Sequence, residues 1–122
     1  MSLSIESFTG EGDLKNERIL IRANDEVDIG DYVLMRSKKN LSGDATSGPK
    51  SAFWFPDVTI NKGDLVVVYT RAGNPSVKRL KSGVDAHFFY WRKERPIWGK
   101  EDANIAVLLE APHWESRAPS YD

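Results

Sequence analysis

The stretch from Phe53 to Thr70 restricts the fold of this chain more than any other segment. An aromatic run ends at Pro56, a short β-branched run follows, and a polar corner from Asn61 to Asp64 precedes a long apolar run. Strand-like runs this close together leave no space for the helix of a βαβ crossover. The segment therefore predicts short strands joined by tight connections.

The remainder of the chain has the same character. No window places apolar residues at helical spacing between helix caps. Runs with strand character recur instead at Leu3–Phe8, Arg18–Ala23, Tyr32–Arg36, Ala52–Phe55, Val58–Ile60, Leu65–Thr70, His87–Trp91 and Ile105–Glu110. The polar residues 38–50 predict a loop. We therefore expect an all-β fold of roughly seven to nine strands, either an antiparallel sandwich or a small barrel.

Length and composition limit the domain organisation. The 122 residues suit one domain, and 40% of them are hydrophobic, enough for a single core. We expect that domain at residues 1–111, followed by an acidic, proline-interrupted tail at residues 112–122. The chain contains no cysteine, which excludes disulfides and thiolate chemistry.

Targeting signals are not visible in the sequence. Met1–Glu6 has neither the basic nor the apolar region of a signal peptide. No apolar run approaches the roughly 20 residues that a membrane helix needs. We expect no transmembrane segment, and the localisation stays open, with the cytoplasm favoured.

Positive charge is concentrated in one segment. Residues 71–100 hold eight Lys or Arg residues and two acidic ones, although the net charge of the chain is −1. The candidate binding cations are Lys78, Arg79, Lys81, Arg92, Lys93 and Arg95. A hairpin of Val77–Leu80 with His87–Trp91 is expected to bring them together from its two ends. Nucleic-acid binding through residues 78–95 is one hypothesis, while the acidic balance of the whole chain favours cations that only solvate a rim.

Aromatic residues suggest two kinds of contact. Tyr90, Trp91 and Trp98 lie close to the cations in sequence and could stack on bases. Trp114 lies in the proline-bounded tail and is the tryptophan least suited to a core. An exposed tryptophan predicts docking onto another protein or another copy of this chain. Edge strands of the expected sheets also invite a partner strand.

Metal-binding patterns are weak. Asn24 to Gly30 alternates like a calcium loop, but Met35 stands where an EF-hand has its bidentate glutamate. His87 and His113 lack the paired spacing of a zinc site. We expect no metal and no cofactor, and we expect His87 to pack among aromatics and bond a neighbouring acid.

Catalytic patterns are also missing. No serine lies in a Gly-x-Ser-x-Gly elbow, and the chain has neither a phosphate loop nor a dinucleotide fingerprint. No acidic pair is marked by an apolar setting that would raise one pKa. We therefore expect a protein that is not an enzyme.

Four segments carry a family resemblance. In chain order they are Asn16–Ile21, Val27–Leu34, Phe55–Thr70 and Trp98–Leu108. They resemble the Asn-Glu strand, the Asp-x-x-Gly-aromatic segment, the Phe-Pro hairpin and the closing Trp-to-Leu motif of the lamin tail domain. That family is an immunoglobulin-like β-sandwich of nuclear lamins and many bacterial proteins, and the resemblance runs from about Ile5 to Leu109.

The resemblance implies a two-sheet antiparallel sandwich and a non-catalytic module, here a stand-alone member of the bacterial type. In that family such domains make protein, membrane-surface or nucleic-acid contacts. We expect protein binding or assembly first, nucleic-acid binding as the alternative, and a hydrolytic enzyme third.

Overall fold

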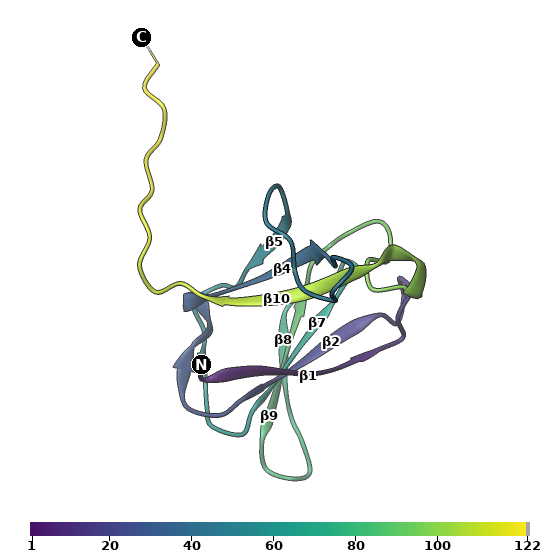
Figure 1. The fold of residues 1–122 in the computed structure, drawn as a ribbon. Helices are drawn as coiled ribbons and strands as arrows, with labels where there is room; N and C mark the ends of the chain where they lie inside the picture. Colours follow the sequence, from purple (N-terminus) through teal and green to yellow (C-terminus); the bar gives the residue numbers. More distant parts are fainter. Residues whose placement is uncertain (122) are drawn as a thin grey trace.

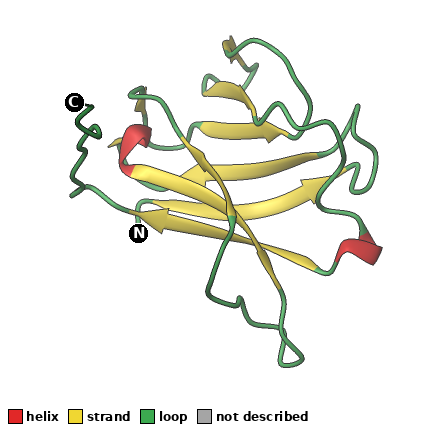
Figure 2. Cartoon of the chain, turned by 90° about the horizontal axis from the view of Figure 1, so that it is seen from above, coloured by secondary structure: helices red, strands yellow, loops and turns green. Residues whose placement is uncertain are grey.

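The computed structural model describes residues 1–121 and consists almost entirely of strands and loops (Figure 1). Among these residues the helices are two single 3-10 turns, η1 at Ile29–Asp31 and η2 at Lys100–Asp102 (Figure 2). The expected all-β class is confirmed. In the described part of the chain, no helix has the length and apolar character that crossing a bilayer requires.

The strands form three sheets. The five-stranded sheet contains, in spatial order, β1 (Leu3–Thr9), β2 (Arg18–Ala23), β7 (Leu65–Tyr69), β9 (Asp85–Tyr90) and β8 (Ser76–Arg79). The three-stranded sheet contains β10 (Asn104–Glu110), β4 (Tyr32–Lys38) and β5 (Ser51–Trp54). A small third sheet pairs β3 (Val27–Asp28) with β6 (Thr59–Ile60). The three-stranded sheet lies over the five-stranded one in Figure 1.

The predicted strand positions agree with the structure to within two residues at each end. Two features differ from the two-sheet antiparallel prediction. The pair β7–β9 is parallel, with Val66 opposite His87 and Val68 opposite Phe89. The chain leaves β7 through Arg71–Pro75, places β8 at the sheet edge, and returns as β9 in the space between them. The third sheet is the other difference, and β3 carried no strand signal of its own.

The core lies between the two larger sheets. Alternation along β2 and β7 turns Ile19, Ile21, Val66 and Val68 to one face, where all are buried. Leu34 of β4 belongs to the same buried cluster. Both sheets therefore share one core.

Phenylalanine rings and the side chain of Tyr32 complete the packing of this core. The Phe55 ring packs edge-on against Phe53 and Phe89, with centroids 5.1 and 5.3 Å away. The buried Tyr32 hydroxyl donates to a carboxylate oxygen of Glu110 at 2.8 Å. Burial and this hydrogen bond raise the pKa of Tyr32. The contact holds the end of β10 against β4.

A buried carboxylate anchors the segment that follows β9. Glu17 is fully buried and accepts a hydrogen bond from the Thr70 hydroxyl at 2.5 Å. It also accepts from the backbone N–H groups of Ile97, Trp98 and Gly12, each at 2.9 Å. The residue before β2 thus fixes Ile97 and Trp98 against the five-stranded sheet.

The tail and the predicted loop lie at the surface. β10 ends at Glu110, and residues 112–121 are exposed and run away from the sheets (Figure 1). Residue 122 of the predicted tail lies outside the described residues. The loop of residues 38–50 contains one isolated bridge, between Lys39 and Ala45.

Candidate binding surface

The outward side of the three-stranded sheet is apolar. Tyr32 and Leu34 turn into the core, so the alternate positions of β4 and the matching positions of β5 and β10 turn outward. At the Lys38 end of β4 this side carries Ser37, which is buried and donates its hydroxyl hydrogen to the Thr46 carbonyl of the following loop at 2.9 Å. We call the rest of this surface the outer face, and its residues are Val33, Met35, Ala52, Trp54, Ile105, Val107 and Leu109. None is charged, and Trp54 and Leu109 remain 52% and 39% exposed. A contiguous apolar surface of this kind is typical of a docking site.

Trp114 of the tail extends the outer face. Its ring meets the Trp54 ring edge to face, with centroids 4.8 Å apart, and is itself 62% exposed. The indole N–H of Trp54 donates to the Gly30 carbonyl at 2.8 Å, which fixes the orientation of that ring. The tail tryptophan therefore stands beside a rigid aromatic partner and not in the core, as expected for it.

Strand β5 forms one edge of its sheet, and among residues 1–121 it pairs only with β4. The N–H of Phe55 donates to the Tyr32 carbonyl, and the register then makes Phe53 the next bonded position. The peptide groups of Ala52 and Trp54 consequently point away from β4. Among the described residues, no backbone hydrogen bond from another segment reaches them.

An open groove of about 780 Å³ borders this free edge. One wall is β5, and the other is the segment of residues 91–97. Arg92 adopts a left-handed backbone with φ of 65° between two ladder bonds, from Trp91 N–H to Tyr69 and from Lys93 N–H to Thr70. This bulge turns the chain from the five-stranded sheet toward β5.

The predicted cations separate into two groups. The hairpin of β8 and β9 exists, but its antiparallel register places Arg79 opposite Asp85, at the closed end. Lys78 and Lys81 lie at that end too. Arg92, Lys93 and Arg95 follow the other end of β9, which rises about 17 Å over its length, and they line the groove. The expectation that the two ends bring all six together is therefore wrong, because the ends of a hairpin arm lie a strand length apart.

Two of the three aromatic residues expected to stack on bases, Tyr90 and Trp98, have covered ring faces, whereas Trp91 is half-buried and lines the groove. Tyr90 stacks on Tyr69 at 5.4 Å with an interplanar angle of 12°. Arg71 lies over both rings, and Gly73 lies so close that a Cβ there would come within 2.4 Å of the Tyr90 ring. Trp98 is buried. The rings of Tyr90 and Trp98 therefore offer packing, and not the open π-face that a base requires.

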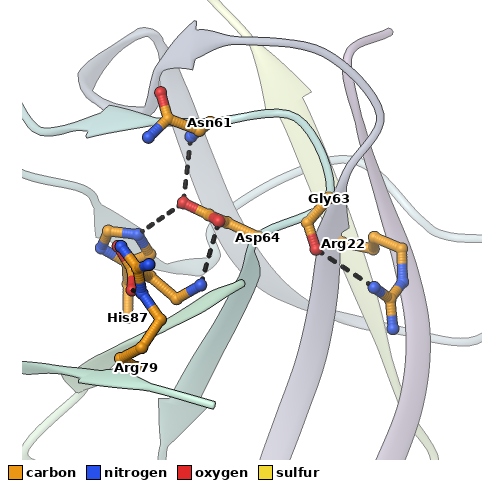
Figure 3. Close-up of polar contacts among 7 residues, drawn as sticks. Arg22, Asn61, Gly63, Asp64, Arg79 and His87 are labelled. Carbon is orange, nitrogen blue, oxygen red and sulfur yellow. Dashed lines mark hydrogen bonds and ion pairs between the residues drawn. The ribbon is translucent and has the colours of Figure 1, made fainter. Parts of the chain in front are cut away.

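A polar cluster lies beside the core at the β7–β9 junction (Figure 3). The Asp64 carboxylate bonds the ring Nε2 of His87 at 3.0 Å and accepts from the N–H groups of Asp85 and Asn61, each at 3.1 Å. Burial alone would raise the pKa of Asp64, but these hydrogen bonds outweigh it and lower the pKa. Arg79 bonds the Asp85 carboxylate, which raises the pKa of the guanidinium. His87 thus bonds an acid as expected, though the acid is Asp64, which the sequence did not mark.

This cluster contains the donor types of a metal site, yet the Asp64 carboxylate, Nε2 of His87 and Oδ1 of Asp85 are already engaged in hydrogen bonds. One ligand atom each from Asp64, Asp85 and His87 lies within 4.8 Å of the others. A metal would have to displace the Asp64–His87 bond and compete with Arg79 for Asp85. The acidic segment 24–30 has another use, since Asp28 caps η1 by accepting from the Gly30 N–H at 2.9 Å. His113 is exposed in the tail.

The outer face is the candidate docking surface that sequence reasoning missed. The signal was present as alternation, with Val33 and Met35 in one strand and Ile105, Val107 and Leu109 in another. Alternate apolar residues identify a strand but not which side of the sheet the core covers. Their opposite neighbours, Leu34 and Leu108, are also apolar, so both sides of the sheet matched a core.

No protein-family model matches the chain, and no curated protein matches its sequence.

Proposed function

We propose that this chain is a non-catalytic protein-interaction module whose docking surface is the outer face. The observation that carries the proposal is the uncharged apolar surface of β10, β4 and β5, extended by Trp114. Exposing Trp54 and Leu109 to water is unfavourable by roughly 25 cal/mol for each Å² of apolar surface. A partner that covers this surface recovers that free energy.

We propose further that the fold is an immunoglobulin-like sandwich of the lamin tail type. The four motif segments support this, because each contains or borders a strand: Asn16–Ile21 leads into β2, Val27–Leu34 runs from β3 to β4, Phe55–Thr70 contains β6 and β7, and Trp98–Leu108 enters β10. The shared core of the five- and three-stranded sheets also suits that architecture.

The absence of catalysis in this proposal rests on the Asp64–His87 pair. It is the one carboxylate–imidazole pair within bonding distance among residues 1–121. His87 is only 6% exposed, and its second ring nitrogen, Nδ1, is buried without a hydrogen-bond partner. A general base must reach the proton that it removes. We therefore assign the pair a structural role, which is to hold β7 and β9 together, and not the role of a general base acting on a substrate.

The experiment is a selection of random linear peptides displayed against the immobilised chain, with retesting on Leu109→Glu. A charge placed in the outer face should abolish binding, since an unpaired carboxylate resists burial. Val77→Glu is the matched control, because Val77 is 58% exposed on β8, away from the outer face. Sedimentation of the chain alone is measured in parallel.

Peptides that bind the wild type and Val77→Glu but not Leu109→Glu support the proposal. A dimer that only Leu109→Glu dissociates also supports it, with a second copy as the partner. A monomer that selects no peptide, or peptides that ignore Leu109→Glu, would overturn it.

A further inference from the structure

The free edge of β5 specifies how a partner is held. Peptide groups of Ala52 and Trp54 point into the open groove, and unpaired groups at a sheet edge are a template for another strand. We propose that the partner is an extended segment of another protein that pairs with β5 as an additional strand. This inference rests on the proposed function and names the partner's conformation and chemistry.

The two sides of such a strand would meet different surfaces. Side chains of a strand alternate between its faces. On one side they would continue the outer face beside Ala52 and Trp54, where apolar residues fit. On the other side they would meet residues 91–97, where three cations accompany the single acid Glu94. The structure therefore favours a segment that alternates apolar and acidic residues.

The cations of the groove differ in how free they are. Arg92 donates to the Gly73 carbonyl at 2.8 Å and so helps to hold its own loop. Lys93 lies 5.4 Å from the centre of the Trp91 ring. Among residues 1–121, neither Lys93 nor Arg95 forms a salt bridge. Lys93 and Arg95 are therefore the cations available to acidic side chains of a partner.

Two segments of this chain are poorer occupants. The tail reaches the end of β5 through Trp114, but its described residues line no part of the groove. Strand β10 of a second copy would face the cations with Ala106 and Leu108, the residues opposite its outer-face positions. Neither supplies a row of acidic side chains.

The test uses a capped synthetic peptide that alternates valine and glutamate, titrated into ¹⁵N-labelled protein. We expect the largest shifts at the backbone amides of Ala52 and Trp54. A peptide that alternates valine and lysine should not bind. N-methylation of the valines and N-methylation of the glutamates should differ in effect, because only alternate N–H groups of an added strand face β5.

Charge variants test the chemistry of the groove. Arg95→Glu should weaken binding of the valine–glutamate peptide by about fivefold or more. Lys81→Glu is the matched control, since Lys81 is also exposed but lies in the β8–β9 turn, and this variant should bind the peptide like the wild type.

Three outcomes would overturn the inference: no binding, equal binding of the lysine peptide, or the same response to both methylation patterns. Its failure is separable from failure of the proposed function. If random peptides bind through Leu109 but carry no alternating acidic pattern, the outer face is a docking site and strand addition is wrong. If no peptide depends on Leu109, the proposed function itself fails.

Discussion

The ring of Trp114 meets the ring of Trp54 edge to face, with centroids 4.8 Å apart, while more than half of each residue remains exposed. Such a pair contributes about 0.5–1.5 kcal/mol beyond its area. Because most of the Trp114 surface stays exposed, we expect Trp114→Ala to lower the free energy of unfolding by less than the roughly 3–5 kcal/mol of a core tryptophan and to weaken peptide binding. Thermal unfolding and peptide titration measure the two effects.

The buried Trp98 provides the comparison for this variant. Trp98→Ala should lower stability by about 3–5 kcal/mol, as is usual for a core tryptophan. A Trp114→Ala protein that fails to fold would show that the tail tryptophan is structural.

Glu17 should be among the most sensitive polar residues. Its carboxylate accepts from one hydroxyl and three backbone N–H groups while fully buried. Glu17→Gln turns an amide N–H₂ toward some of these donors. We expect this substitution to lower the free energy of unfolding by about 2–4 kcal/mol. Urea unfolding measures it, with the exposed Glu11→Gln as control. Equal stability of the two variants would contradict the role given to Glu17.

Asp64 should make stability depend on pH in the acid range. Its pKa is lower in the folded chain than its usual value of 3.8, so the folded state holds the proton less tightly than the unfolded state. The stabilisation is fully present above the unfolded pKa and is lost as the pH falls through the lower folded pKa. Asp64→Asn should lower the free energy of unfolding by about 1–3 kcal/mol at neutral pH. It should also reduce the dependence of that free energy on pH in the acid range.

Unfolding free energies measured across the acid range check the Asp64 prediction. Asp25→Asn, at an exposed turn position, should keep the wild-type slope. If the stability of Asp64→Asn depends on pH in the acid range as steeply as that of the wild type, the pH dependence comes from other carboxyl groups.

Gly73 should tolerate no larger residue. A Cβ at this position would come within 2.4 Å of the Tyr90 ring, so Gly73→Ala must displace the ring or the loop. We expect Gly73→Ala to lower the free energy of unfolding by about 1–3 kcal/mol, which thermal unfolding measures. In a Tyr90→Leu background the loss should shrink, because the obstructing ring is gone. Equal losses in both backgrounds would place the strain elsewhere.

Nucleic-acid binding is the alternative function, and we expect it to be weak. The cations lie in two separate groups, and the rings of Tyr90 and Trp98 are covered. Single-stranded DNA at low salt should produce no gel shift. A shift that disappears in the combined variant Lys78→Ala, Arg79→Ala, Arg92→Ala and Lys93→Ala would reverse this ranking.

Local sequence patterns were sufficient to predict where the strands lie, but not how the strands pair into sheets. The alternation of Ile19 and Ile21, and the polar corner before Leu65, predicted β2 and β7 closely. The parallel pairing of β7 with β9 was not predictable. It depends on how far Arg71–Pro75 carries the chain across the sheet, which no local propensity encodes.

The candidate binding surface, too, was predictable from the sequence only in part. The exposure of Trp114 followed from its sequence, because a proline-bounded tail cannot deliver a large ring to the core. The outer face, the open edge at Ala52 and the separation of the cations did not follow. They arise from register and sheet order, which decide the neighbours of each side chain.

By itself, the amino-acid sequence determined that this protein is all-β, because spacing and turn chemistry act between neighbouring residues. The tertiary structure alone decided which apolar face of the three-stranded sheet is buried and which faces outward. Both faces of β4 have apolar residues, and only packing of Leu34 against the five-stranded sheet leaves Val33 and Met35 outside.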